Sequence, residues 1–237
     1  EQVVTEAARC VPMPDSMPFD EAAALIFTYG TSYHALKQRA RMCAGETLLV
    51  LGAAGGVGLS TVELGRAMGA RVVAAASSDE KVALAMERGA HSGMVYGRGP
   101  FDKDGCKALA AQFKEAVGAD GADVIYDAVG GDYAEAALRA SAWKGRFLVV
   151  GFPAGIPRIP LNLALLKGGD IVGVFWGSFT KREAQANDEN NRELIELYAQ
   201  GKIKPHVSQR FPLAEAGAAI TELAERRAMG KVVVTIG

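Results

Sequence analysis

A glycine-rich turn at residues 52–58 is the part of the sequence best suited to chemistry. Gly52, Gly55 and Gly58 lie three residues apart, Gly56 adds a fourth glycine, and the apolar run 48–51 precedes them. Glycines let a backbone approach a pyrophosphate closely, and the free N–H groups that open the next helix attract its charge. The spacing departs from a strict GxGxxG, and such a turn can also be only a packing contact. Its place between a strand and a helix favours a dinucleotide site.

The choice of cofactor depends on the end of the second strand-like run. NAD enzymes carry an Asp or Glu there, about 20 residues after the glycine loop, which binds the ribose hydroxyls. Residues 72–78 read Val-Val-Ala-Ala-Ala-Ser-Ser instead. Ser77 and Lys81 offer a hydroxyl and a cation to a 2′-phosphate, so we predict NADPH as the cofactor. In the alternative interpretation Ser77 caps the next helix, with Glu80 completing a capping box, and Lys81 is solvated.

The elements that must position these residues alternate between strands and helices. Residues 56–68 place Val57, Thr61, Leu64 and Met68 on one helical stripe. Such alternation requires crossover connections, which predicts an α/β fold with a doubly wound parallel Rossmann sheet. The strand-like runs cover residues 47–51, 71–75, 92–96, 122–127, 146–150 and 171–175.

Both ends of the chain depart from this rhythm. Residues 2–5 predict a short strand, and prolines follow it at positions 12, 14 and 18. After Trp176 the pattern predicts a helix over 182–200, an extended piece over 203–207, a helix over 213–227 and a last strand over 231–236.

The composition excludes several classes of partner. Lys and Arg number 26 and Asp and Glu 27, so net charge favours neither nucleic acid nor a membrane surface. No apolar run approaches the ~20 residues that span a bilayer, and the first residues lack a signal-peptide pattern, so we expect a cytoplasmic protein. Cys10, Cys43 and Cys106 show no CxxC spacing, which suits a reducing compartment, and we expect them to be small core residues.

Several motifs together resemble one enzyme family. They are Asp-Glu-Ala-Ala-Ala at 20–24, Thr-Ser-Tyr-His-Ala-Leu at 31–36, the glycine loop, Asp-Ala-Val-Gly-Gly at 127–131, Val-Gly-Phe at 150–152 and Gly-Lys-Val-Val at 230–233. Over nearly the whole chain, the sequence resembles the zinc-independent, zeta-crystallin-like quinone oxidoreductase branch of the medium-chain dehydrogenases/reductases.

The resemblance implies roles for individual residues. The pyrophosphate would lie at Ala54, Gly55, Gly56 and Val57; the 2′-phosphate and adenine ribose at Ser77, Lys81 and Tyr96; and the nicotinamide towards Thr31, Val129, Phe152, Phe175 and Trp176, with Gly151 also binding the cofactor. Asp127 either borders the ligand crevice or satisfies backbone donors in the turn at 130–131.

The resemblance also implies a division of the chain. Residues 1–20 would be the last part of an N-terminal GroES-like catalytic domain, 21–176 a Rossmann NADP-binding domain, and 177–237 a segment that partly returns to the catalytic domain. We therefore expect the chain to be part of a longer protein. The segment 27–31, where zinc-dependent relatives place a ligand, holds no Cys, His or carboxylate, and His34, His91 and His206 stand isolated, so we predict no metal.

The activity implied is transfer of hydride from NADPH to a quinone or to a double bond conjugated to a carbonyl. No catalytic residue is assigned, since Tyr33 is a proton source in one interpretation and a core aromatic in another. A short-chain dehydrogenase would need the pair Tyr198 and Lys202 on one helix face, but Gly201 lies between them. A non-catalytic NADPH sensor is a third possibility. We also expect a homodimer formed through the strand at 231–236.

Overall fold

The core of the molecule is one parallel sheet. A computed structural model describes residues 3–236, apart from the side chain of Ala8. Six strands lie in the order β3-β2-β1-β4-β5-β6, so the α/β Rossmann fold predicted from the sequence is confirmed. The strands are β1 (Thr47–Leu51), β2 (Arg71–Ala76), β3 (Ser92–Val95), β4 (Ala122–Asp127), β5 (Ser141–Val149) and β6 (Asp170–Gly173).

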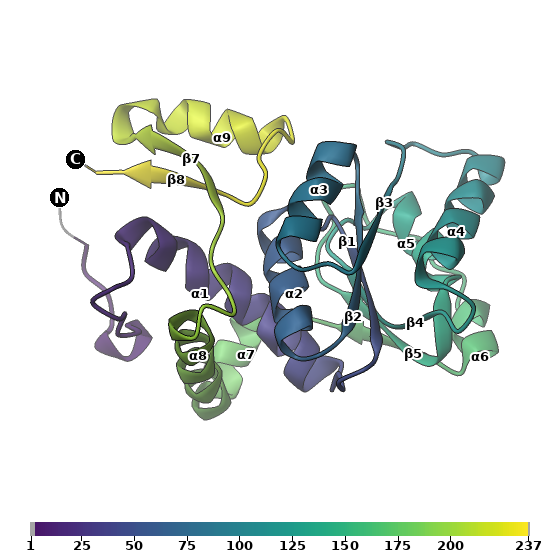
Figure 1. Ribbon diagram of the computed structural model, residues 1–237, viewed down its shortest axis with the longest axis horizontal. Coiled ribbons are helices and arrows are strands. Elements are labelled where there is room, and N and C mark those ends of the chain that lie inside the picture. Colours follow the sequence, from purple (N-terminus) through teal and green to yellow (C-terminus); the bar gives the residue numbers. More distant parts are fainter. Residues whose placement is uncertain (1–2, 237) are drawn as a thin grey trace.

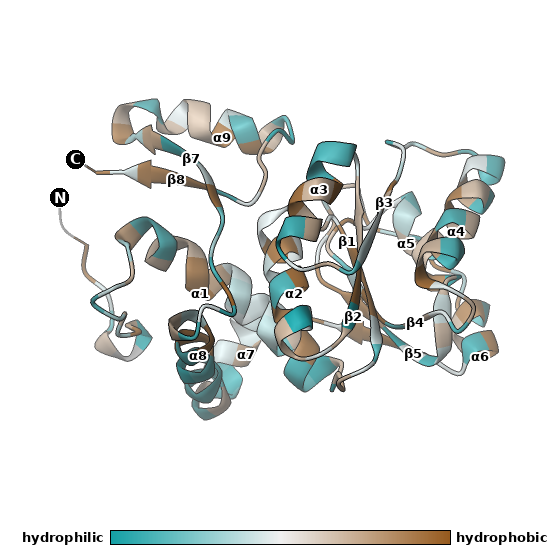
Figure 2. Ribbon diagram, viewed as in Figure 1, coloured by the Kyte–Doolittle hydropathy of each residue, from teal (hydrophilic) through white to brown (hydrophobic). Residues whose placement is uncertain are grey.

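Helices cover both faces of this sheet (Figure 1). Leu48 and Val50 of β1 pack on one face and Leu49 and Leu51 on the other, as the two-residue period of a strand requires. The hydropathy colouring shows the buried strands between helices whose outer faces are polar (Figure 2). The first face carries α2 (Gly56–Ala67) and α3 (Asp79–Glu87), and the second carries α4 (Lys103–Val117), α5 (Asp132–Leu138) and α6 (Asn162–Lys167).

Glycines end two of these helices where the sequence places them. Gly69 follows α2 at φ +82° and Gly89 follows α3 at φ +113°. Only glycine adopts such backbone conformations without strain, so each helix stops within two residues of its glycine.

The remaining elements form a second group beside the Rossmann domain (Figure 1). They are α1 (Phe19–His34), a π-helical turn (Ala35–Arg39), α7 (Trp176–Arg182), α8 (Ala184–Ala199), β7 (Val207–Pro212), α9 (Ala216–Ala224) and β8 (Lys231–Thr235), with 3-10 turns at Ala7–Arg9 and Leu213–Glu215. Strands β7 and β8 pair in parallel as a separate two-stranded sheet. We call β7, α9 and β8 the C-terminal lobe.

One predicted strand is wrong, and the predicted extended piece joins a strand only at its last residue. Residues 3–5 form no strand, and Gln2 lies outside the described residues. In the predicted piece 203–207, β7 starts only at Val207, because the backbone N–H and C=O of Lys204 bond the side chains of Glu63 and Arg88 rather than a strand. The residue after it, Pro205, has no N–H to donate.

Other boundaries shift, and the cysteines differ from expectation. The helix predicted over 213–227 is α-helical only from Ala216 to Ala224, and β5 begins five residues early at Ser141. Cys10 and Cys43 are exposed and Cys106 is half-buried, so none is a core residue. All three lie outside the continuous strand and helix faces that build the core.

The last strand bears on the expected dimer. β8 pairs only with β7, while β3 and β6 are the edges of the six-stranded sheet. The dimer through 231–236 therefore stays a prediction. None of the helices within residues 3–236 is long and apolar enough to cross a membrane.

Candidate cofactor-binding cleft

A cleft of about 240 Å³ lies where the chain order of the sheet reverses, between β1 and β4. Ligands of open α/β sheets bind at this switch point, beyond the carboxyl ends of the strands. The loops after five strands and the loop before β8 line it: Gly52, Ala54, Gly55, Val57, Ala76, Ser77, Lys81, Tyr96, Arg98, Ala128, Val129, Tyr133, Pro153, Ala154, Arg226 and Ala228.

The glycine loop forms one wall. Gly52 adopts φ +69°, and a Cβ on Gly58 would come within 2.1 Å of the Gly52 carbonyl oxygen, so only glycine fits at position 58. Helix α2 begins after Gly55, and no side chain caps it. The first N–H groups of a helix have no partner within it, so those of α2 are available to an anion at the cleft.

Gly56 faces other parts of the molecule than Gly55 does. A Cβ on Gly56 would lie 3.1 Å from Lys231 and 3.2 Å from Thr28, so this glycine allows α2 to pack against α1 and β8. It does not line the cleft. A Cβ on Gly55 would meet only the Gly52 oxygen, at 3.4 Å, and Gly55 is the glycine at which a side chain would enter the cleft.

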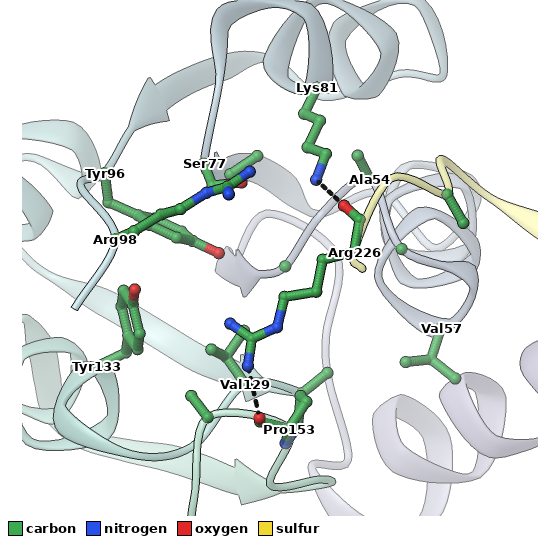
Figure 3. A pocket seen from close by; sticks show the side chains of 16 residues that line it. Ala54, Val57, Ser77, Lys81, Tyr96, Arg98, Val129, Tyr133, Pro153 and Arg226 are labelled. Atoms are coloured by element: carbon green, nitrogen blue, oxygen red, sulfur yellow. Dashed lines mark hydrogen bonds between the residues drawn. The ribbon is translucent and has the colours of Figure 1, made fainter. Parts of the chain in front are cut away.

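The other end of the cleft is strongly positive. Lys81, Arg98 and Arg226 converge on it (Figure 3), and its lining within residues 3–236 includes no Asp or Glu. The Nζ of Lys81 donates to the Arg226 carbonyl at 3.2 Å, and Nη2 of Arg226 donates to the Pro153 carbonyl at 2.9 Å. Partial burial lowers the pKa of Lys81, and the charges of Arg98 and Arg226 lower it further. This end is suited to a phosphate.

Ser77 lines the cleft and does not cap α3. The helix starts at Asp79, and the hydroxyl of Ser78 accepts the backbone N–H of Lys81 at 3.4 Å. The predicted capping box of Ser77 and Glu80 is therefore wrong by one residue. Because Ser78 takes the cap, the Ser77 hydroxyl is free to contact a ligand.

Two tyrosines support this end. Tyr96 is buried, its ring lies 5.0 Å from that of Tyr133, and burial raises the pKa of its phenol. The Tyr133 hydroxyl donates to the Gly97 carbonyl at 3.1 Å and accepts the Gly99 N–H at 2.9 Å. Tyr133 thereby fixes the loop that carries Arg98.

The residues expected near the nicotinamide lie outside this lining, except Val129. The Thr31 hydroxyl bonds the carbonyl of Phe27 one turn back, and Trp176 packs edge-on against the Phe27 ring at 5.8 Å. Phe152 is 46% and Phe175 75% exposed. Gly151 lies next to Phe152, at the carboxyl end of β5. Phe152 follows β5, and Phe175 and Trp176 follow the neighbouring strand β6.

Asp127 has a structural role. Its side chain is 2% exposed, and Oδ1 accepts the N–H groups of Val129 at 2.8 Å and Gly130 at 2.9 Å. Burial raises the pKa of this carboxyl. Of the two alternatives, the structure therefore supports the one in which Asp127 fixes the turn after β4, with Gly130 at φ +73°.

Each of the three histidines contacts a side chain or a backbone group of the protein. His34 stacks on Phe179 with ring centroids 3.9 Å apart, and His91 Nδ1 accepts the Val72 N–H at 3.0 Å. His206 Nδ1 lies 2.7 Å from Arg88 Nη2. Among residues 3–236 no group of three or more His, Cys, Asp or Glu side chains has the arrangement of a metal site.

The tyrosine–lysine pairs are not at the cleft. The Tyr198 hydroxyl donates to Glu21 at 2.7 Å, α8 ends at Ala199, and Lys202 lies beyond Gly201 at φ +68°. A second pair four residues apart, Tyr33 and Lys37, shares a helix face, but both side chains bond Glu193 and neither lines the cleft. Neither pair therefore places a tyrosine and a lysine at the cleft, as a short-chain dehydrogenase needs.

The sequence missed both arginines of the cleft. Arg98 lies two residues beyond Tyr96, at the carboxyl end of the third strand, and this position was a usable signal. Arg226 comes from the far end of the chain, and only the return of the C-terminal lobe brings it to the cleft. Phe27 and Tyr133 were missed as well.

Comparisons with known proteins agree with this architecture. Residues 56–194 match the family model described as zinc-binding dehydrogenase. The chain is 36% identical to quinone oxidoreductase-like protein 2 of Bos taurus, over 100% of the chain and 66% of that protein. It is 34% identical to the quinone oxidoreductase of Pseudomonas aeruginosa, over 95% of the chain and 67% of that protein.

A solved structure gives the same result. The quinone oxidoreductase of Thermus thermophilus, whose complex with NADPH is also known, superposes with a TM-score of 0.81 at 33% identity, covering 95% of this chain and 69% of that one. The fold and cleft thus define a medium-chain dehydrogenase/reductase. The chain belongs to the quinone oxidoreductase-like branch of that superfamily, and it spans 66% of the length of the Bos taurus relative.

Proposed function

We propose that the chain is the cofactor-binding part of an oxidoreductase that transfers hydride from NADPH to a quinone or to a carbon–carbon double bond conjugated to a carbonyl. The observation that carries this proposal is the phosphate end of the cleft. Three cations line it, β2 ends without a carboxylate, and the lining described here includes no acidic side chain. A 2′-phosphate therefore meets attraction and no repulsion.

The residues present fit the cofactor. The uncapped start of α2 and Gly55, which has no side chain, leave room for a pyrophosphate, and Ser77 with Lys81 offers donors to the 2′-phosphate. The bound cofactor supplies the hydride. The protein would bind its phosphates and orient the ring on the apolar side of Val129.

The enzyme is proposed to work without zinc. Zinc sites need three or four His, Cys or carboxylate ligands in tetrahedral positions. Residues 27–31 supply none, and the isolated histidines already have other contacts.

The remaining assignments are proposals of the same kind. Residues 1–20 and part of 177–237 would belong to a GroES-like catalytic domain, and the free thiols of Cys10, Cys43 and Cys106 suit a reducing compartment such as the cytoplasm. A homodimer would cover the open edge of β8. Sedimentation at micromolar concentration tests it: a dimer is expected, and a monomer contradicts it.

Turnover tests the function itself. NADPH absorbance is followed with a panel of quinones and enones added to the chain and to the intact gene product. Steady, enzyme-dependent oxidation with one of these acceptors is expected. Tight NADPH binding without oxidation by any acceptor in the intact protein would instead indicate a sensor.

A further inference from the structure

Arg88 connects two parts of the molecule away from the cleft. It is the residue that ends α3. Its Nη1 donates to the Glu63 carboxylate and to the Lys204 carbonyl, each at 3.2 Å, and its Nη2 donates to His206 Nδ1 at 2.7 Å. A guanidinium has only donors, so His206 Nδ1 must accept. Arg88 thus binds the Rossmann domain to the segment 203–206 that leads into β7, which we call the entry segment.

The buried carboxylate of Glu63 joins Arg88 and the entry segment to α2. The carboxylate lies in α2, with its side chain 5% exposed, and also accepts the Tyr29 hydroxyl at 2.7 Å and the Lys204 N–H at 2.8 Å. A buried charge needs such partners, and removing one of them leaves it uncompensated. The entry segment is therefore attached to the same helix whose first turn faces the cleft.

The entry segment in turn holds the loop of residues 225–230, which we call the α9–β8 loop. The His206 carbonyl accepts the Lys231 N–H at 2.8 Å, and a Cβ on Gly230 would come within 2.5 Å of that oxygen. The Gly230 N–H donates to the Ala54 carbonyl at 2.8 Å, in the glycine loop itself. The two segments and the glycine loop thus meet at Gly230.

Arg226 lies in the same α9–β8 loop. Its backbone has φ +59°, a conformation that a side-chain-bearing residue keeps only when its surroundings hold it. Its carbonyl is bonded by Lys81 and its guanidinium lines the cleft (Figure 3).

We propose that Arg88 is a positioning residue for the cofactor: by fixing the entry segment it holds the α9–β8 loop over the glycine loop and keeps the Arg226 guanidinium in the cleft. The inference rests on the proposed function, because the cofactor is the ligand that Arg226 would meet. Arg88 does not line the cleft, and its hydrogen-bond partners Glu63, Lys204 and His206 lie outside the cleft lining described for residues 3–236.

Amide hydrogen exchange, which needs no cofactor, tests the positioning. In Arg88→Ala the amides of Gly230 and Lys231 are expected to exchange roughly tenfold faster, as local opening does when supporting contacts are lost. The amides of α4 should keep their wild-type exchange rates. Unchanged protection at Gly230 and Lys231 in the folded variant overturns the proposal.

A conservative variant covers the case in which Arg88→Ala does not fold. Arg88→Lys keeps a cation beside Glu63 but lacks the fork that also reaches Lys204 and His206. The same two amides should lose protection in it, and wild-type protection again overturns the proposal. Arg139→Ala, which removes an arginine paired with Glu135 on α5, is the matched control and should change neither amide.

Binding measurements test whether Arg88 acts through Arg226. Arg88→Ala should weaken NADPH roughly tenfold, within the usual range of coupling between separate sites. In an Arg226→Ala background the same change should cost less than about twofold. An equal loss of NADPH affinity in both backgrounds would overturn the claim that Arg88 acts through Arg226. Absence of NADPH binding by the wild-type chain contradicts the proposed function instead, and the exchange rates still decide the role of Arg88.

Discussion

The two ends of the cofactor cleft are built in different ways. The phosphate end is lined by side chains from the Rossmann domain and from the α9–β8 loop, and Lys81 and Arg226 each donate to a backbone carbonyl of the cleft. At the end proposed for the nicotinamide, Phe152 and Phe175 keep much of their surface exposed. Under the proposed function, the difference teaches that cofactor affinity would depend on polar contacts inside this chain, whereas acceptor binding would depend on exposed apolar side chains.

The largest effect is expected from blocking the phosphate end. In Gly55→Val the new side chain is added at a residue that lines the cleft, where its Cβ meets only the Gly52 oxygen, so NADPH affinity should fall by more than about a hundredfold. Titration of the folded variant by nicotinamide fluorescence measures it. Gly217→Val, at a helical position where an added Cβ meets nothing within 4 Å, is the control. Wild-type affinity in Gly55→Val would remove the glycine loop from the site.

At the end proposed for the nicotinamide, we expect a smaller effect that falls on turnover and leaves NADPH affinity nearly unchanged. Phe175→Ala removes a side chain that is 75% exposed and bonded to nothing, so the free energy of unfolding should change by less than about 1 kcal/mol. The kcat/KM for a quinone should drop roughly tenfold through lost apolar contact. The Kd for NADPH should stay within about twofold of wild type. A loss of NADPH affinity as large as the loss in kcat/KM would show that the two ends are not separate.

The smallest expected effect is a change in the pH dependence of stability when His206, a partner of Arg88, is replaced. Burial lowers the pKa of His206, and the charge of Arg88 lowers it further, against the opposite influence of Glu87. The unfolded chain then binds more protons than the folded one below about pH 6.5, so stability falls as the pH falls through that region. His206→Asn should lose less stability between about pH 7 and pH 5.5. Urea unfolding at several pH values measures the slopes, and identical slopes would contradict this role of His206.

Local patterns were enough to predict the sheet and one wall of the cleft. The apolar runs, the helical stripe beginning at Val57 and the glycines at 52, 55 and 58 each act over a few residues, and the structure has them at the predicted places. Ser78 caps α3 in place of Ser77, because serines stand at both positions and the helix start decides between them.

Features that depend on distant contacts were not predictable in this way. Arg226 reaches the cleft only through the fold of the C-terminal lobe, and its neighbours in sequence show no sign of a site. The sequence predicted only an extended piece at 203–207, and its bonds through Lys204 to Glu63 and Arg88 depend on residues far away in the chain. The roles of Phe175 and Trp176 at the cofactor stay predictions, and the packing of Trp176 against α1 at Gly30 could not be predicted from local pattern.

The central claim is that the cations of the phosphate end read the 2′-phosphate, and Lys81→Ala tests it most directly. Kd values for NADPH and NADH are measured for this variant and for wild type at one fixed ionic strength, because salt screens exposed charges. A charge-assisted hydrogen bond contributes about 1.5–3 kcal/mol, and ~1.4 kcal/mol is a factor of ten in affinity. NADPH affinity should therefore fall by about one to two powers of ten, while NADH affinity barely changes. An equal loss for both cofactors would contradict the claim.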